Sequence, residues 1–173
     1  MKKIGIFYGP TGGSTEKVAT MIKEEFGDVD VTMYPISDHT AAFINHFEVV
    51  IFGCSTLGSE TWNGKSTKSD WDLFRPEFDK LTVSGKIFAL YGTGNHLTYP
   101  RNFVDSMGIL GKILLEKDAT IIGQCPTSDY EFTESEAVIN GEFIGLPIDE
   151  DFEASKTTER VKNWVIGLKK ILF

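Results

Sequence analysis

Tyr8-Gly9-Pro10-Thr11-Gly12-Gly13-Ser14-Thr15-Glu16 is a segment rich in small and hydroxylated residues. The residues before it, 2–8, are apolar or aromatic over the length of one strand. After it, apolar residues recur every four positions at Val18, Ile22 and Phe26, which is the spacing of one helical face. The stretch is therefore predicted to be a turn that joins a strand to a helix.

This turn has the chemistry of a phosphate site. The first N–H groups of a helix have no partner within the helix, and the helix dipole favours an anion in front of them. Glycine lets the backbone approach a ligand closely, and hydroxyl side chains can donate further hydrogen bonds. An ordinary helix cap after a glycine turn would look the same in this stretch alone. As a binding loop it comprises Pro10, Thr11, Gly12, Gly13, Ser14 and Thr15.

The composition is that of a globular protein with an acidic surface. The 173 residues, 41% of them hydrophobic, predict a single domain over residues 1–173. No apolar run approaches the ~20 residues of a membrane span, and the first residues do not resemble a signal peptide. Cys54 and Cys125 lack metal-ligand spacing and are expected to be reduced thiols of a cytoplasmic protein. The net charge of −8 argues against nucleic acid and anionic membranes, and favours basic protein partners.

Strands and helices are expected to alternate along the rest of the chain. The near-continuous apolar run 48–54 is typical of a strand buried on both faces. Asp70 is expected to cap a helix that Pro76 shortens or kinks, and Pro100 to begin the next helix. Five strands alternating with helices predict a parallel sheet covered on both faces. The other strands are expected at 29–36, 86–92 and 119–123, and the other helices at 41–46 and 157–172.

Ligands of such sheets bind beyond the carboxyl ends of the strands, where the strand order reverses. Three loops are expected at that edge, namely 9–15, 55–69 and 93–99. The first has the phosphate chemistry, and the other two carry Leu57, Trp62 and Tyr99, which can cover an aromatic ring. A phosphate site at one end and a covered ring at the other predict a mononucleotide.

These residues resemble flavodoxin, the FMN-binding electron carrier. The resemblance extends essentially from end to end and is carried by 2–16, 52–56, 69–74, 92–94 and 99–108. Residues 126–151 are similar to the insertion that interrupts the last strand in long-chain members. The resemblance implies an α/β fold, with a five-stranded parallel sheet of order 2-1-3-4-5 and helices on both faces.

The resemblance also implies which residues hold a non-covalently bound FMN. In addition to the phosphate loop they are Ser55, Thr56, Leu57, Gly58, Thr93, Gly94, Asn95 and Tyr99. In the family, the backbone carbonyl at the position of Gly58 turns toward flavin N5 when the ring takes up one electron and a proton. Leu57 stands where long-chain members usually have the Trp that covers one flavin face, so either Leu57 or Trp62 could cover it here.

The chain departs from the family pattern within these loops. Pro10 and Gly12 stand where the first two hydroxyl residues of the phosphate loop usually stand, and Asn95 replaces a common Asp. His96 and the acidic run 149–151 are expected to be solvated loop residues.

The implied function is that of a low-potential one-electron carrier and not of an enzyme. Such a carrier cycles between semiquinone and hydroquinone and passes electrons between redox proteins, such as reductases, oxoacid oxidoreductases and low-potential acceptors. It is expected to be a monomer without catalytic residues or metal. Two alternatives stay open, an FMN-dependent quinone or nitro reductase and a flavodoxin-fold interaction module that no longer binds FMN. A receiver domain is not expected, because Gly9-Pro10 and Cys54-Ser55 stand where it needs acidic residues.

Overall fold

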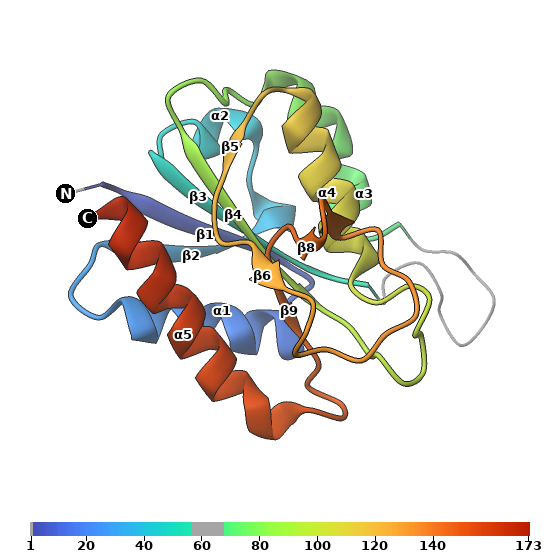
Figure 1. Cartoon of the computed structure of the whole chain (residues 1–173). Helices are drawn as coiled ribbons and strands as arrows, with labels where there is room; N and C mark the ends of the chain where they lie inside the picture. The colour runs from blue at the N-terminus through green and yellow to red at the C-terminus, as the bar shows by residue number, and fades with distance from the viewer. Residues whose placement is uncertain (1, 57–67) are drawn as a thin grey trace.

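A parallel sheet of order β2-β1-β3-β4-β5 forms the centre of the protein, as the resemblance to flavodoxin implies (Figure 1). The computed structural model describes residues 2–56 and 68–173, so Leu57, Gly58 and Trp62 lie outside the described residues. A further strand, β9, also pairs with β4. The strands of this sheet are β1 (Ile4–Gly9), β2 (Val31–Pro35), β3 (Val49–Ser55), β4 (Ile87–Thr93), β5 (Thr120–Ile121) and β9 (Leu146–Ile148).

Helices cover both faces of the sheet (Figure 1). On one face lie α1 (Ser14–Phe26) and α5 (Ala154–Leu172), whose apolar stripes pack against the same side of the strands. The other face is covered by shorter helices that share a second apolar cluster. These are α2 (Ala41–Ile44), α3 (Asp70–Phe74) and α4 (Asp105–Glu116), with the 3-10 helices η1 (Ile36–Asp38) and η2 (Arg75–Lys80).

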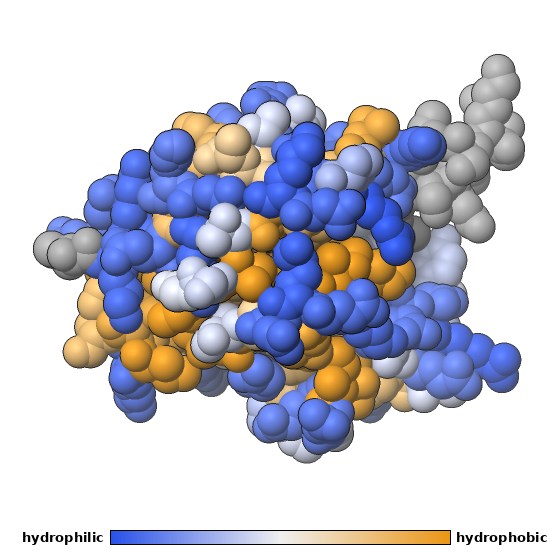
Figure 2. Space-filling model, turned by 90° about the horizontal axis from the view of Figure 1, so that it is seen from above, coloured by the Kyte–Doolittle hydropathy of each residue, from blue (hydrophilic) through white to orange (hydrophobic). Residues whose placement is uncertain are grey.

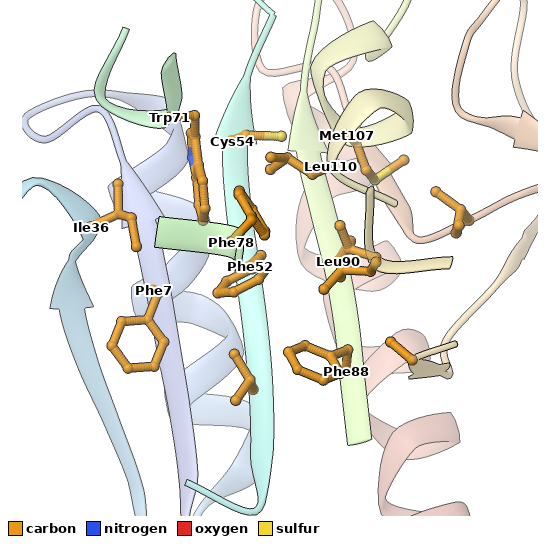
Figure 3. Packing of buried hydrophobic residues seen from close by; sticks show 14 of the residues in the cluster. Phe7, Ile36, Phe52, Cys54, Trp71, Phe78, Phe88, Leu90, Met107 and Leu110 are labelled. Carbon is orange, nitrogen blue, oxygen red and sulfur yellow. The ribbon is translucent and has the colours of Figure 1, made fainter. Parts of the chain in front are cut away.

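The side chains of the central strands are buried on both faces of the sheet. Neighbouring residues point to opposite faces, and helices cover each face. Phe7, Phe52 and Phe88 face the shorter helices, as Figure 3 shows. The ring of Phe52 lies 5.0 Å from that of Trp71 and 5.9 Å from that of Phe88. The residues that alternate with these phenylalanines face α1 and α5. The apolar runs of the sequence therefore become the middle layer of a three-layer protein.

The cap of α3 differs from the prediction by one residue. Ser69, not Asp70, is the N-cap, because its hydroxyl accepts the Asp72 N–H while the Asp72 side chain accepts the Ser69 N–H. This reciprocal pair is a capping box. Pro76 has the predicted effect, since α3 ends at Phe74 and the chain continues as the 3-10 helix η2.

The start of α4 was predicted wrongly at Pro100. The helix begins at Asp105, after Val104 adopts a left-handed conformation with φ of 50°. Turns occupy the intervening residues, and the carbonyl of Pro100 accepts hydrogen bonds from the N–H groups of Thr133 and Glu134. A contact with a segment about thirty residues later in the chain therefore replaces the first helical turn.

The edge of the sheet beside β4 is divided between two short strands. β5 pairs with Ile87 and Phe88 at the start of β4, whereas β9 pairs with residues 91–93 at its end. The strand expected at 119–123 is thus only two residues long. Between β5 and β9 lies a small antiparallel sheet of order β6-β8-β7, made of β6 (Cys125–Pro126), β7 (Val138–Ile139) and β8 (Glu142–Phe143).

Two helical glycines provide a test of this packing. A Cβ on Gly108 of α4 would lie 2.2 Å from the backbone of Glu136, whereas a Cβ on Gly167 of α5 would meet nothing within 4 Å. Alanine favours a helix over glycine by roughly 0.5–1 kcal/mol. We expect Gly167→Ala to stabilise the protein by about that amount, and Gly108→Ala to destabilise it by about 1–3 kcal/mol through overpacking. Denaturant unfolding of both variants measures the difference, and equal stabilisation by both would contradict the docking of 133–137 on α4.

Candidate functional site

The carboxyl ends of β1, β3 and β4 lie side by side, and hydrogen bonds join the loops that follow them. The hydroxyl oxygens of Thr15 and Thr93 are 3.0 Å apart, and both residues are buried. The Thr56 N–H donates to the Thr93 carbonyl at 3.1 Å. Three segments far apart in the sequence therefore meet at one edge of the sheet, as predicted for a ligand site.

The loop after β1 places exposed backbone in front of α1. Gly12 has a φ of 80°, a left-handed conformation that glycine adopts without strain. The N-cap residue Gly13 offers no side-chain cap, so the first amides of α1 remain available to an acceptor in front of the helix. One loop amide already faces a carboxylate, because Gly12 N donates to Glu16 Oε2 at 2.6 Å. The loop can therefore bind an anion through backbone groups, although Pro10 and Gly12 carry no hydroxyl.

The loop after β3 contributes a polar atom that lacks a partner. Thr56 Oγ1 is buried and has no hydrogen-bond partner within the described parts of the chain. A buried hydroxyl without a partner costs free energy, so such an atom marks a place where a ligand or water is expected. Cys54, two residues earlier, is buried in the core as expected, and burial raises the pKa of its thiol.

The loop after β4 is a turn closed by Asn95. The Asn95 side-chain oxygen accepts the Thr98 N–H at 2.7 Å, and its backbone carbonyl accepts the Tyr99 N–H at 3.0 Å. The backbone of Tyr99 is thus held in place while its ring is 39% exposed. Leu97 in the same turn is exposed as well. The turn presents a flat ring and an aliphatic side chain to the space outside the sheet.

His96 and Asp149 were predicted wrongly as solvated residues. His96 is only 8% exposed and Asp149 is fully buried, and His96 Nδ1 lies 2.5 Å from Asp149 Oδ2. Burial alone would raise the pKa of the Asp149 carboxyl. Hydrogen bonds from the N–H groups of His96, Phe152 and Asp151 and from the His96 ring outweigh it, so the pKa lies below its ordinary value.

No local signal in the sequence distinguishes this pair from surface residues. The partners are separated by 53 positions, and only the pairing of β9 with β4 brings them together. The buried hydrogen-bonded pair is therefore a long-range feature of the fold. It connects the turn after β4 to the turn after β9.

The strand order and the three convergent loops define a flavodoxin-like α/β protein. The flavodoxin family model matches residues 6–164. Flavodoxin of Nostoc sp. is 39% identical over 168 residues, which cover 97% of this chain and 96% of that one. Flavodoxin of Trichodesmium erythraeum is 42% identical over 171 residues, covering 98% and 97%. The chain belongs to the flavodoxin family.

A solved structure agrees with this assignment. The Fusobacterium nucleatum flavodoxin bound to flavin mononucleotide superposes with a TM-score of 0.87 at 26% identity, covering 99% of both chains. Within residues 2–56 and 68–173, no group of three or more His, Cys, Asp or Glu could hold a metal ion. None of the helices in those ranges has the length and apolar content that a membrane crossing requires.

The buried carboxylate predicts a pH dependence of stability. Because the folded-state pKa of Asp149 lies below its unfolded value near 3.9, its contribution is present above that pH and is lost as the pH falls through the folded pKa. Asp149→Asn should lower the free energy of unfolding at pH 7 by about 1.5–3 kcal/mol, the scale of hydrogen bonds to a charged group.

This difference from the wild type should shrink on acidification to about pH 3. Unfolding in denaturant between pH 7 and 3 measures it, with the exposed Asp28→Asn as control, expected within about 0.5 kcal/mol of wild type. A deficit that stays constant across this range would show that the carboxylate charge does not provide the stability.

Proposed function

We propose that this protein is a low-potential one-electron carrier that binds one FMN non-covalently at the edge formed by the loops after β1, β3 and β4. The observation that carries the proposal is the meeting of these loops around a buried Thr56 hydroxyl without a partner in the described residues. Membership of the flavodoxin family, whose members are electron-transfer proteins and not enzymes, supports it. The reductase alternative is not favoured by any of these relatives.

The phosphate would be held by the loop Pro10, Thr11, Gly12, Gly13, Ser14 and Thr15. The free amides at the start of α1 and the positive end of the helix dipole fit a phosphate. Pro10 has no N–H to donate, and the Gly12 N–H and the Thr15 hydroxyl are already hydrogen-bonded to Glu16 and Thr93, so these three residues would contribute least as direct donors. Backbone amides therefore do most of the binding in this loop.

The isoalloxazine ring would lie between the loops after β3 and β4. Tyr99 can stack on one face, since its ring is exposed while its backbone is fixed. Ser55, Thr56, Thr93, Gly94 and Asn95 line the same edge and would offer polar groups to the ring. Leu57 and Gly58, outside the described residues, remain candidates for the other face and for the carbonyl at flavin N5.

Bound FMN would supply the one-electron chemistry, and the chain would tune its potential. Asp149 and Asp151 place carboxylates beside the turn after β4. Negative charge near the ring opposes the uptake of further negative charge, so these groups would lower the reduction potential. Apolar cover such as the Tyr99 ring would exclude water and strengthen this effect.

The remaining assignments extend the same proposal. The whole chain, residues 1–173, would act as a single domain and a monomer, with 126–151 as the insertion of long-chain members. Its partners would be redox proteins with basic docking surfaces, because the chain carries a net charge of −8. Two unpaired cysteines, Cys54 and Cys125, are in keeping with a cytoplasmic location.

Thr56 provides the test of cofactor binding. The apoprotein should bind one equivalent of FMN and discriminate against FAD, as measured by flavin fluorescence quenching. Thr56→Val should weaken FMN binding by about 0.5–1.5 kcal/mol, the net value of one hydrogen bond, without destabilising the apoprotein. Thr157→Val is the matched control, because Thr157 Oγ1 in α5 is also buried and without a partner among the described residues.

Thr157→Val should leave FMN affinity unchanged. Failure of the wild-type apoprotein to bind FMN would overturn the proposed function. Equal loss of affinity in both variants would instead remove Thr56 from the site.

Docking to partners should depend on salt. Electron transfer from a basic reductase should slow steeply between 0.1 and 1 M salt, because the Debye length falls from about 10 Å to about 3 Å. Stopped-flow rates at constant pH measure this, with a neutral small-molecule reductant as the control that should respond little. An electron-transfer rate from the reductase that does not change with ionic strength would indicate apolar docking.

A further inference from the structure

We propose that His96 is a positioning residue for the flavin site, which fixes the turn 95–99 through its bond to buried Asp149. The inference rests on the FMN function proposed above. It concerns a residue expected to be solvated from the sequence, whose role is visible only in the structure.

The bond itself is fully enclosed. His96 Nδ1 lies 2.5 Å from Asp149 Oδ2, and the His96 backbone N–H donates to the same oxygen at 3.0 Å. The other oxygen, Oδ1, accepts the N–H groups of Asp151 and Phe152, both at 2.9 Å. The carboxylate of Asp149 thus collects four hydrogen bonds from two turns. Because it is ionised, the hydrogen of the short bond resides on His96 Nδ1, whether the ring is neutral or protonated.

The position of His96 within the turn gives this bond its effect. Before it, Gly94 N donates to the Ile148 carbonyl at 2.9 Å, and after it Pro100 O is held by the N–H groups of Thr133 and Glu134. Between these two attachments the turn bulges outward, with exposed side chains at Leu97 and Tyr99. His96 is the inward-pointing side chain of the bulge and anchors its first half to the buried carboxylate.

Packing holds the imidazole in the orientation that the bond needs. Its ring lies edge-on to Phe103 at 6.2 Å and to Phe152 at 6.3 Å between centroids. Beside it, Asn95 Nδ2 donates to Asp151 Oδ2 at 2.9 Å, so a second bond joins the same two turns. This second bond is exposed, and water competes with it. The enclosed His96 bond therefore holds this turn against the turn after β9, and the Asn95 bonds to the Thr98 and Tyr99 N–H groups hold Tyr99 within it.

The test separates positioning from mere stability by measuring two ligands. Riboflavin lacks the phosphate and reports on the ring end of the site, whereas FMN reports on both ends. His96→Leu and His96→Phe remove the donor, and the second keeps an aromatic ring between Phe103 and Phe152. His96→Asn places an amide N–H near the position of Nδ1. Thr98→Ala is the control for an exposed side chain of the same turn, because only the backbone N–H of Thr98 takes part in the hydrogen bonds of the turn.

We expect both donor-free variants to weaken riboflavin and FMN by the same factor, about tenfold, and to shift the visible absorption of bound flavin. His96→Asn should restore both affinities to within about threefold, and Thr98→Ala should leave the absorption unchanged. Thermal unfolding of each apoprotein gives the folded fraction for correcting the affinities. The inference would be overturned if the donor-free variants bound riboflavin as tightly as the wild type does, or if they lost affinity for FMN alone.

A measurement on the wild-type apoprotein covers the case in which the donor-free variants do not fold. The Nδ1 hydrogen of His96 should give a slowly exchanging proton resonance by NMR, and the Thr98 and Tyr99 amides should be protected from exchange. Their absence would overturn the inference. Failure of the wild type to bind either flavin would overturn the proposed function and the positioning role together. Flavin affinities that do not change when His96 is substituted would overturn the positioning role alone.

Discussion

The hydroxyl of Tyr91 donates to the carbonyl of Thr15 at 2.7 Å, and the arrangement of the site depends on this bond. The ring crosses from β4 over β3 at Gly53, where a Cβ would lie only 2.0 Å from it. Burial raises the pKa of the phenol well above its ordinary value, so the group stays a donor. Together with the Thr15–Thr93 bond, it connects the start of α1 to the sheet, so the loop in front of that helix has a fixed position relative to the other two.

The layers could be predicted from the sequence because they follow from local patterns, whereas the strand order was implied by the resemblance to flavodoxin. A strand such as β3 (Val49–Ser55) is buried on both faces and is therefore almost entirely apolar. A helix such as α5 has a stripe of apolar residues whose helical spacing is visible in the sequence. The meeting of the three loops at one edge could be predicted because the carboxyl ends of parallel strands all lie at the same edge of a sheet. The start of α4 and the burial of His96 could not be predicted, since hydrogen bonds to residues about thirty and fifty positions away decide them.

The site combines rigid and incomplete parts. Asp149 is satisfied by four hydrogen bonds, whereas Thr56 Oγ1 lacks a partner in the described residues. A satisfied buried carboxylate holds its neighbours in one arrangement, whereas a buried hydroxyl without a partner leaves hydrogen-bonding capacity unused. The framework is thus preorganised where it supports the loops, and it keeps an unused hydroxyl among them.

Over the face in Figure 2, hydrophilic residues separate the exposed hydrophobic patches.

The divided edge beside β4 has a consequence for the behaviour of the protein at high concentration. A long, flat edge strand exposes a row of backbone donors and acceptors on which another chain can assemble as an additional strand. Here the edge beside β4 consists of β5, with two residues, and β9, with three. The chain between these two strands leaves the sheet and returns to it, so they do not form one continuous strand. At the opposite edge, β2 ends in Pro35, which has no N–H to offer. Among the described strands, the edge beside β4 therefore has no long continuous ladder, and Pro35 removes one donor from the end of β2, so both features limit growth of the sheet into aggregates.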